Sequence, residues 1–203
     1  THFWADSRAG KTAALKAALS VWGNPDTTMG NFNSTSVGIE RMASIYNDLP
    51  FGIDEKQAVG NNKDFINNLV YMLGLGQGRT RGTKTGGVQN RMSWNMAIIT
   101  TGEEPISSET SQTGISSRTL ELYGPLFDKE RDAIEMHRFT TKNYGLAGRK
   151  YIKYLIENIV VPKSNLLDDL YDFFCTKLEE NKEENNKKSK YTFCYSKSIE
   201  LGS

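Results

Sequence analysis

Residues 5–12 carry the residue types of a phosphate-binding loop. They read ADSRAGKT, one position away from the pattern G-x-x-x-x-G-K-[ST], with Ala5 in place of the first glycine. In such a loop, successive backbone N–H groups of the loop and of the following helix point at phosphates. We expect Lys11 to reach the β- and γ-phosphates and the Thr12 hydroxyl to ligate magnesium. The residues predicted to cradle the nucleotide are Ser7, Arg8, Ala9, Gly10, Lys11, Thr12 and Ala13.

The motif alone is weak evidence, because a Gly-Lys-[Ser/Thr] tripeptide arises by chance in roughly one chain of this length in ten, but its context supports the interpretation. The tripeptide follows the aromatic stretch THFW and opens a helical pattern that Gly23-Asn24-Pro25 ends. Alanine at position 5 costs little where φ is negative and about 1 kcal/mol where φ is positive. We therefore expect an intact phosphate site. A strand of about five residues normally precedes such a loop, so we interpret the chain as part of a larger protein with its first strand truncated.

A pair of acids provides the second candidate group. In LPFGIDE, Asp54 ends an apolar run that we expect to be a strand beside the loop strand. There its carboxylate can hold Mg²⁺, while Glu55 can orient or deprotonate an attacking water. The alternative is that the two acids cap a following helix.

The third candidate is the end of the apolar stretch MAIITTGE. Thr100 or Thr101 stands where a nucleotide-hydrolysing enzyme places the residue that senses the γ-phosphate. We take Thr101 as the catalytic candidate, although the sequence does not separate the two and threonine is also an ordinary strand residue.

The elements that position these residues alternate between strand and helix patterns. We expect strands in THFW, TTMGNFNS, LPFGIDE, SWNMAIITTGE and RTLELYG, and helices in TAALKAALSVWG, TSVGIERMASIYN and NKDFINNLVYMLG. This alternation predicts an α/β fold, a parallel sheet with helices on both faces. From residue 128 the pattern is helical, apart from a charged loop at 181–190. We therefore predict an ATPase core over residues 1–127 and a helical extension over 128–203.

Composition limits the classes of protein. The 203 residues are 37% hydrophobic and 24% charged with a net charge of +1, which is typical of a globular domain without a global basic field. Cys175 and Cys194 have no CxxC spacing, which argues against zinc and against a disulfide scaffold. No apolar run approaches the roughly 18 to 20 residues that span a bilayer. We expect a cytoplasmic protein without membrane association.

Several separated stretches together resemble an uncharacterised family of P-loop ATPase domains carried by phages, prophages and other mobile elements, often in primase–helicase-like proteins. These stretches are HFWADSRAGKTAALKAALSVWGNP, NDLPFGIDE, YMLGLGQGRTRG and SWNMAIITTGEEPI. In that family the loop normally reads G-x-S-S-x-G-K-T. Ser7 and Gly10-Lys11-Thr12 match, whereas Ala5 and Arg8 depart from it. The resemblance covers roughly residues 1 to 125.

The resemblance implies a RecA- or AAA-like core with Walker A and Walker B motifs, related to superfamily 3 helicases of DNA replication. In that layout a basic segment between the acid pair and the sensor strand forms a hairpin that touches DNA. The matching segment here is GQGRTRGTKTGGVQNR, with Arg79, Arg81, Lys84 and Arg91. Glycine allows close approach to phosphates and Arg or Lys supplies charge for contacts that are independent of sequence, but a solvated basic loop has the same composition.

Such ATPases form oligomers, often rings, in which an arginine reaches the γ-phosphate of a neighbour. Arg118, in GISSRTLELYG, follows the sensor strand and is the candidate for this role; a salt bridge at a strand edge is the alternative.

Two functions remain open. The first is magnesium-dependent ATP hydrolysis that drives a nucleic-acid motor on single- or double-stranded DNA, acting as a homo-oligomer with a missing N-terminal domain. The second is an ATP-binding switch or assembly module that hydrolyses slowly and touches no DNA. Glu55 favours the motor, while Ala5, Arg8 and the near-neutral charge leave the switch open.

Overall fold

The computed structural model describes residues 1–55, 63–83, 85–107, 114, 118–162 and 165–185. Two compact units make up the chain, Thr1–Leu146 and Ala147–Ser203. The predicted boundary at residue 127 precedes a helix that belongs to the first unit.

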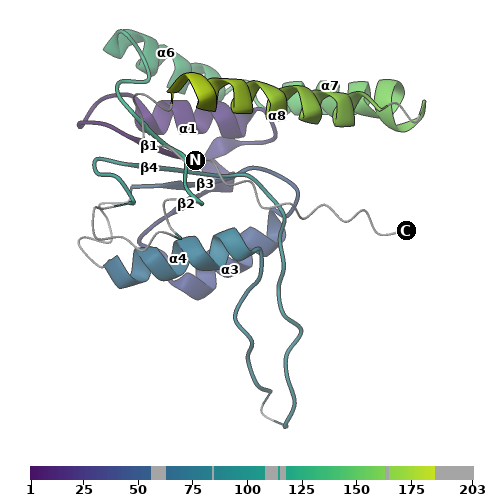
Figure 1. Cartoon of the computed structure of the whole chain (residues 1–203). Coiled ribbons are helices and arrows are strands. Elements are labelled where there is room, and N and C mark those ends of the chain that lie inside the picture. The colour runs from purple at the N-terminus through teal and green to yellow at the C-terminus, as the bar shows by residue number, and fades with distance from the viewer. Residues whose placement is uncertain (56–62, 84, 108–113, 115–117, 163–164, 186–203) are drawn as a thin grey trace. The chain divides into compact units, whose positions relative to one another are not determined.

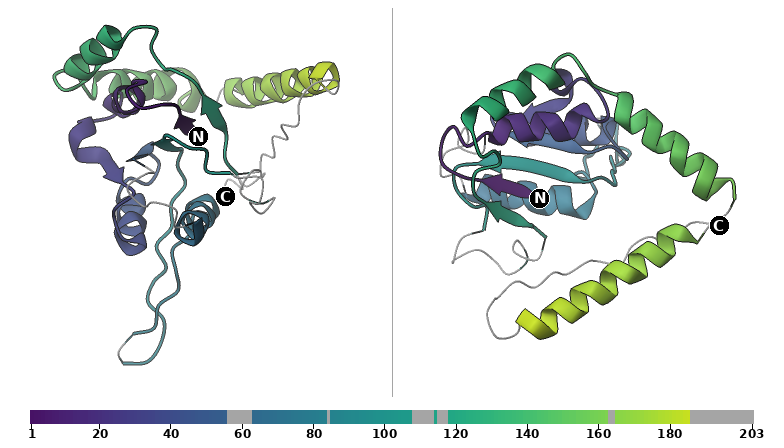
Figure 2. Two further views of the ribbon diagram at one scale, coloured as in Figure 1. Left: turned by 90° about the vertical axis from the view of Figure 1, so that its left-hand side faces the viewer. Right: turned by 90° about the horizontal axis from the view of Figure 1, so that it is seen from above.

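The first unit is built on a five-stranded sheet, as expected from the alternating pattern. Its strands are β1 (His2–Trp4), β2 (Met29–Asn31), β3 (Phe51–Asp54), β4 (Ile98–Gly102) and β5 (Glu121–Tyr123). They lie in the order β2-β3-β4-β1-β5, and every neighbouring pair is parallel (Figure 2). The carboxyl ends of all five strands therefore meet at one edge, where open parallel sheets bind their ligands.

The strand that ends at Asp54 does not lie beside β1, contrary to the expectation from the sequence. β4 lies between them, because Thr100 pairs with His2 on one side and with Ile53 on the other. β4 begins with apolar residues that helices can cover on both faces of the sheet, as is typical of a strand in the middle of a parallel sheet.

Helices cover both faces of this sheet. Figure 1 shows α1 (Lys11–Ser20) and α6 (Glu130–Thr140) over one face and α3 (Ser36–Ile45) and α4 (Lys63–Leu75) over the other. The larger hydrophobic cluster lies between α3, α4 and the sheet, with Phe32, Ile39, Ala43, Phe51, Ile53, Leu69, Met72, Leu73 and Trp94 buried in it. The predicted parallel sheet with helices on both faces is confirmed.

Local capping explains where two of the helices begin. The short helix α2 (Pro25–Thr28) has proline at its first position, and the Asn24 side chain accepts from the Asp26 N–H. α3 is capped by Thr35, whose side chain accepts from the Gly38 N–H at 3.1 Å. The side chain of Ile45, the last residue of α3, is 74% exposed.

A long hairpin connects α4 to β4. Its two arms are antiparallel, with bridges between Gln77 and Ser93 and between Gly82 and Val88. The Gly78 N–H donates to the Met92 carbonyl at 2.8 Å, which closes its base. In Figure 1 this hairpin projects from the unit on the side of α3 and α4.

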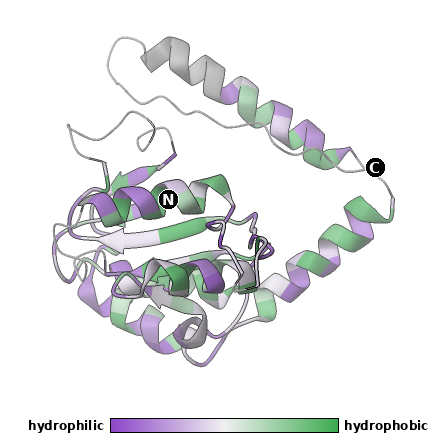
Figure 3. Ribbon diagram, turned by 90° about the horizontal axis from the view of Figure 1, so that it is seen from below, coloured by the Kyte–Doolittle hydropathy of each residue, from purple (hydrophilic) through white to green (hydrophobic). Residues whose placement is uncertain are grey.

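The second unit is helical over its described part. α7 (Leu146–Leu155) starts at the unit boundary and continues into a π-helical turn (Ile156–Val160), and α8 spans Leu166–Asn185. α8 includes residues 181–185 of the predicted charged loop, because lysine and glutamate are good helix formers; the remaining residues of that loop lie outside the described part. Figure 3 shows hydrophobic and hydrophilic residues alternating along these helices. None of the helices in the described ranges has the length and apolar character needed to cross a membrane.

Candidate nucleotide site

The loop from Ala5 to Gly10 joins β1 to α1 and tolerates alanine at its first position. Ala5 is buried, its N–H donates to the Gly102 carbonyl at 3.2 Å, and its φ is not positive, so the missing glycine introduces no strain. Gly10 has no such freedom. Its φ is 79°, and a Cβ there would lie 2.5 Å from Cδ2 of Phe127. The loop therefore requires Gly10 and accepts Ala5.

Lys11 folds back over the loop. Its ammonium group donates to the Ala5 carbonyl at 2.8 Å and to the Asp6 carbonyl at 2.7 Å. An ammonium group has three donors, so a further acceptor can bind to Lys11 where the loop meets α1.

Asp54 is the centre of a hydrogen-bonded cluster built from α1, β3 and β4. It accepts from the Thr12 hydroxyl at 2.8 Å through Oδ2 and from the Thr101 hydroxyl through Oδ1. The Thr101 hydroxyl also accepts from the Glu55 N–H at 3.3 Å. Asp54 and Thr101 are buried. Both hydroxyls donate to Asp54, so that each of its two side-chain oxygens accepts one hydrogen bond.

The cluster fits a hard cation. Mg²⁺ prefers oxygen ligands and is held in proteins by one or two carboxylates together with substrate phosphates. Asp54 and Thr12 supply a carboxylate and a hydroxyl beside the loop. Among the residues that the structure describes, no group of three or more His, Cys, Asp or Glu side chains could hold a metal by itself.

The two threonines of β4 point to opposite sides, as successive strand residues do. Thr100 contacts the buried His2, with 2.8 Å between its hydroxyl and Nδ1, and the other ring nitrogen donates to the Glu104 carbonyl at 3.0 Å. Thr101 faces Asp54. The geometry thus separates two residues that the sequence left equivalent, and places Thr101 in the cluster.

Glu55 follows Asp54 with its side chain exposed and a φ of 60°. Its carboxylate accepts from the Asn31 side-chain amide at 3.1 Å. Asn31 ends β2 and was missed in the sequence; its signal was a polar residue at the carboxyl end of a short strand. A second carboxylate, Glu103 after β4, accepts from the Ser7 hydroxyl of the loop.

Arg118 lies away from the loop. Its guanidinium lies 5.2 Å from the centroid of the Tyr71 ring on α4 and donates to the Gly114 carbonyl at 2.8 Å. Neither contact is the strand-edge salt bridge that was considered as the alternative. The contact of Arg118 with the γ-phosphate of a neighbouring subunit stays a prediction.

The basic residues of the hairpin have different environments. Arg81 donates to both carboxylate oxygens of Glu40, at 2.9 and 2.5 Å, and Glu40 is buried on α3. The hydrogen bonds from Arg81 hold the pKa of Glu40 below its ordinary value. Arg81 thus fixes the hairpin to α3, a partner that the sequence did not reveal.

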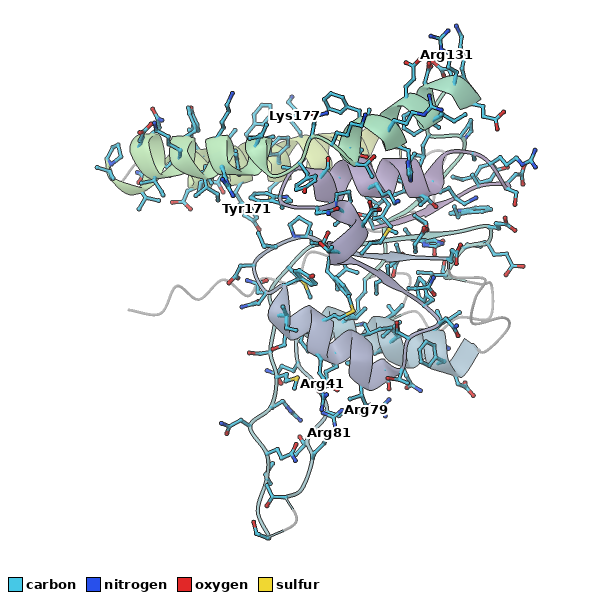
Figure 4. The ribbon with its side chains drawn as sticks, turned by 180° about the vertical axis from the view of Figure 1, so that it is seen from behind. Arg41, Arg79, Arg81, Arg131, Tyr171 and Lys177 are labelled. Carbon is cyan, nitrogen blue, oxygen red and sulfur yellow. The ribbon has the colours of Figure 1, made fainter. Side chains whose placement is uncertain are left out.

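Of the other hairpin cations, Arg91 donates across the hairpin to Gln77 at 2.9 Å and to Thr80 at 2.5 Å. Lys84 lies outside the described residues. Arg79 is exposed, and its backbone donates to Glu40, the residue before Arg41 on α3. Figure 4 labels both arginines at the base of the hairpin.

A cavity of about 410 Å³ opens between the loop and α6. It is lined by residues 8–13 and by Glu130, Ala133, Ile134, His137 and Arg138. All the residues that the sequence placed around the phosphates, apart from Ser7, therefore share one hollow. The α6 residues were missed, because the sequence assigned this helix to the extension.

Part of this chain matches a known family model, and its fold is similar to that of a solved structure. The family model of a domain of unknown function, DUF927, matches residues 1–93. No curated protein matches the chain. A solved structure described as "SCCmec type IV Cch - active helicase" is similar with a TM-score of 0.67 and 22% sequence identity. The match covers 93% of this chain and 33% of that one, so the chain spans about a third of the length of that protein.

Proposed function

We propose that this chain is the ATP-hydrolysing domain of a helicase-like protein of a mobile element. The observation that carries the proposal is the cluster of Thr12, Asp54 and Thr101 beside the loop cavity. It unites three segments distant in sequence at the carboxyl edge of a parallel sheet, where ligands bind in folds of this kind. The similarity to a structure described as an active helicase supports the motor assignment.

In this proposal the loop is a Walker A motif and β3 carries the Walker B acids. The N–H groups at the start of α1 and the Lys11 ammonium bind the phosphates of ATP. Thr12 and Asp54 would hold magnesium, which when bound neutralises the charge that develops on the phosphates. Asp54 keeps its orientation through Thr101.

Glu55 is the proposed base. Its carboxylate is exposed next to the cluster and can accept a proton from water. The Asn31 amide orients that carboxylate, and the Glu55 N–H is fixed by Thr101. Thr101 thereby links the proposed metal ligand to the proposed base.

Nucleic acid is the proposed partner, with the hairpin as the contact. Arg79 and Arg41 are at its base and Arg91 lies on its second arm. We expect these arginines to contact the phosphates of the nucleic acid. Because such contacts release counterions, binding should weaken steeply as the salt concentration rises. Arg81 is engaged by Glu40 and contributes by holding the hairpin in place.

The experiment is ATP turnover by the wild type, Lys11→Ala and Glu55→Gln, each with and without single-stranded DNA. We expect turnover by the wild type that DNA accelerates, loss of ATP binding in Lys11→Ala, and ATP binding without turnover in Glu55→Gln. Undiminished turnover in Glu55→Gln would contradict the assignment of the base.

The alternative is an ATP-binding switch that does not respond to DNA. One observation favours it: Lys11 and Glu55 are each held by groups of the chain itself, Lys11 by loop carbonyls and Glu55 by Asn31. ATP binding with no turnover, unchanged by DNA and by Asn31→Ala, would support the switch.

A further inference from the structure

One face of α6 lines the cavity beside the loop. The lining residues of this helix are Glu130, Ala133, Ile134, His137 and Arg138. Their spacing of three and four residues puts them on a single stripe. We refer to these five residues as the α6 stripe.

Contacts with α1 fix this stripe next to the loop. A Cβ at Gly10 would lie 3.2 Å from Cβ of Ala133, so the first turns of the two helices approach closely. Further along, the Lys16 ammonium donates to Nε2 of His137 at 2.9 Å and to Asp26 at 2.7 Å. The cavity thus has two walls, the loop and the α6 stripe, whose separation is set by direct packing.

The two walls of the cavity both carry positive charge, and the α6 wall adds an apolar residue and an acid. Arg8, Lys11 and Arg138 bring positive charge, and no carboxylate among the described residues forms an ion pair with Arg8 or Arg138. Ile134 is apolar and 46% exposed. Glu130 is the single acid of the lining. A ligand that matches the two walls together has an anionic part, an apolar flat part and hydroxyl donors.

We propose that the α6 stripe seats the nucleoside half of the nucleotide whose phosphates the loop binds. Ala133 and Ile134 lie against the base. The Glu130 carboxylate would repel phosphates, and it accepts hydrogen bonds from the ribose hydroxyls, as acids do in other nucleotide sites. This inference rests on the proposed function and adds the residues that distinguish a nucleotide from its bare phosphate chain.

The test compares two ligands, ATP and inorganic tripolyphosphate, on the full chain by calorimetry. Ile134→Ala should weaken ATP binding by roughly tenfold, since the base loses apolar contact, and leave tripolyphosphate binding unchanged. Ile45→Ala is the matched control, because Ile45 is exposed on α3, on the other face of the sheet. Glu130→Gln should reduce the preference for ATP over 2′,3′-dideoxy-ATP.

The outcomes separate two properties of the protein, nucleoside binding by the α6 stripe and phosphate binding by the loop. If Ile134→Ala weakens neither ligand, or weakens both equally, the α6 stripe is not the nucleoside seat, although phosphate binding by the loop stands. If the wild type binds neither ATP nor tripolyphosphate, the proposed function itself fails. A loss confined to ATP, absent in Ile45→Ala, supports the inference.

Discussion

At the scale of single residues, the most informative pair is Thr100 and Thr101. Adjacent in sequence and identical in type, they serve different clusters because a strand turns successive side chains to opposite faces. Thr101 donates to Asp54, and Thr100 lies against His2. A sequence pattern reports residue types, whereas the choice between these two depends on which face of β4 meets the loop.

This difference leads to the first prediction. Thr101→Val removes the hydroxyl that holds Asp54 and the Glu55 N–H, so the rate of ATP turnover should fall roughly tenfold to a hundredfold. Thr100→Val should lower the free energy of unfolding, through His2, while turnover of the folded protein stays near that of the wild type. Steady-state kinetics and thermal melting of both variants check this. Equal kinetic losses in the two variants would contradict the assignment of Thr101.

At the scale of elements, the hairpin depends on two residues at its base. Arg81 pairs with the buried Glu40, and Gly78 allows the close approach. A Cβ at Gly78 would lie 2.0 Å from Oε1 of Glu40 and 2.7 Å from its Cδ. Because Glu40 is buried and held by Arg81, it has little room to move away.

The second prediction concerns this glycine. Gly78→Ala should destabilise the protein by about 1–3 kcal/mol, as overpacking does in a filled site. Gly82→Ala, on the same arm, is the control, since its Cβ would lie 3.7 Å from the nearest atom, the Gly87 carbonyl oxygen. Urea unfolding compares them. A loss as large in Gly82→Ala would point to backbone entropy instead of contact with Glu40.

The third prediction is a pH dependence. Arg81 lowers the pKa of Glu40 from its ordinary value of 4.5, so folding gains stability from this pair above pH 4.5. That gain is lost as the pH falls through the lowered pKa of the folded protein. Arg81→Met should therefore lower the melting temperature by several degrees at pH 7, and the difference from the wild type should shrink at acid pH. A difference that is constant with pH would exclude the ion pair as the cause.

At the scale of the whole molecule, the cavity between the loop and α6 lies within the first unit. Every residue that lines it belongs to Thr1–Leu146. Because α6 packs on α1, the helix contributes to the core that the sequence had ended at residue 127.

The fourth prediction follows from this division. A chain ending at Leu146 should fold cooperatively and bind ATP with an affinity within about threefold of the full chain, since it keeps both walls of the cavity. Circular dichroism on heating and calorimetry measure the two properties. Chains ending at residue 127 lack α6 and should lose ATP affinity; equal affinity at both lengths would contradict a role for α6.

The sequence predicts the parallel sheet because its strands are short apolar runs separated by helical patterns and ended by polar residues, as at Asp54 and Thr101. It also predicts the start of the helix that becomes α1, where Gly10, Lys11 and Thr12 are consecutive. It misses what depends on packing between distant segments. Three features were missed for this reason: the position of β4 between β1 and β3, the Arg81–Glu40 pair and the α6 wall of the cavity. Each joins distant segments, and neither segment has a sequence pattern that identifies its partner.

The place of β1 in the sheet also governs how this protein is made. Residues 2–4 pair with residues 100–102, which the ribosome adds about 98 residues later, and with residues 121–123, which it adds about 119 residues later. At roughly 5 to 20 residues per second, these intervals last about 5 to 20 s and about 6 to 24 s. Until residues 100–102 have been added, β1 has neither of its two partner strands, and the loop that follows β1 lacks the paired strand that holds its start. The loop between β1 and α1 therefore reaches its folded geometry late in the synthesis of this unit.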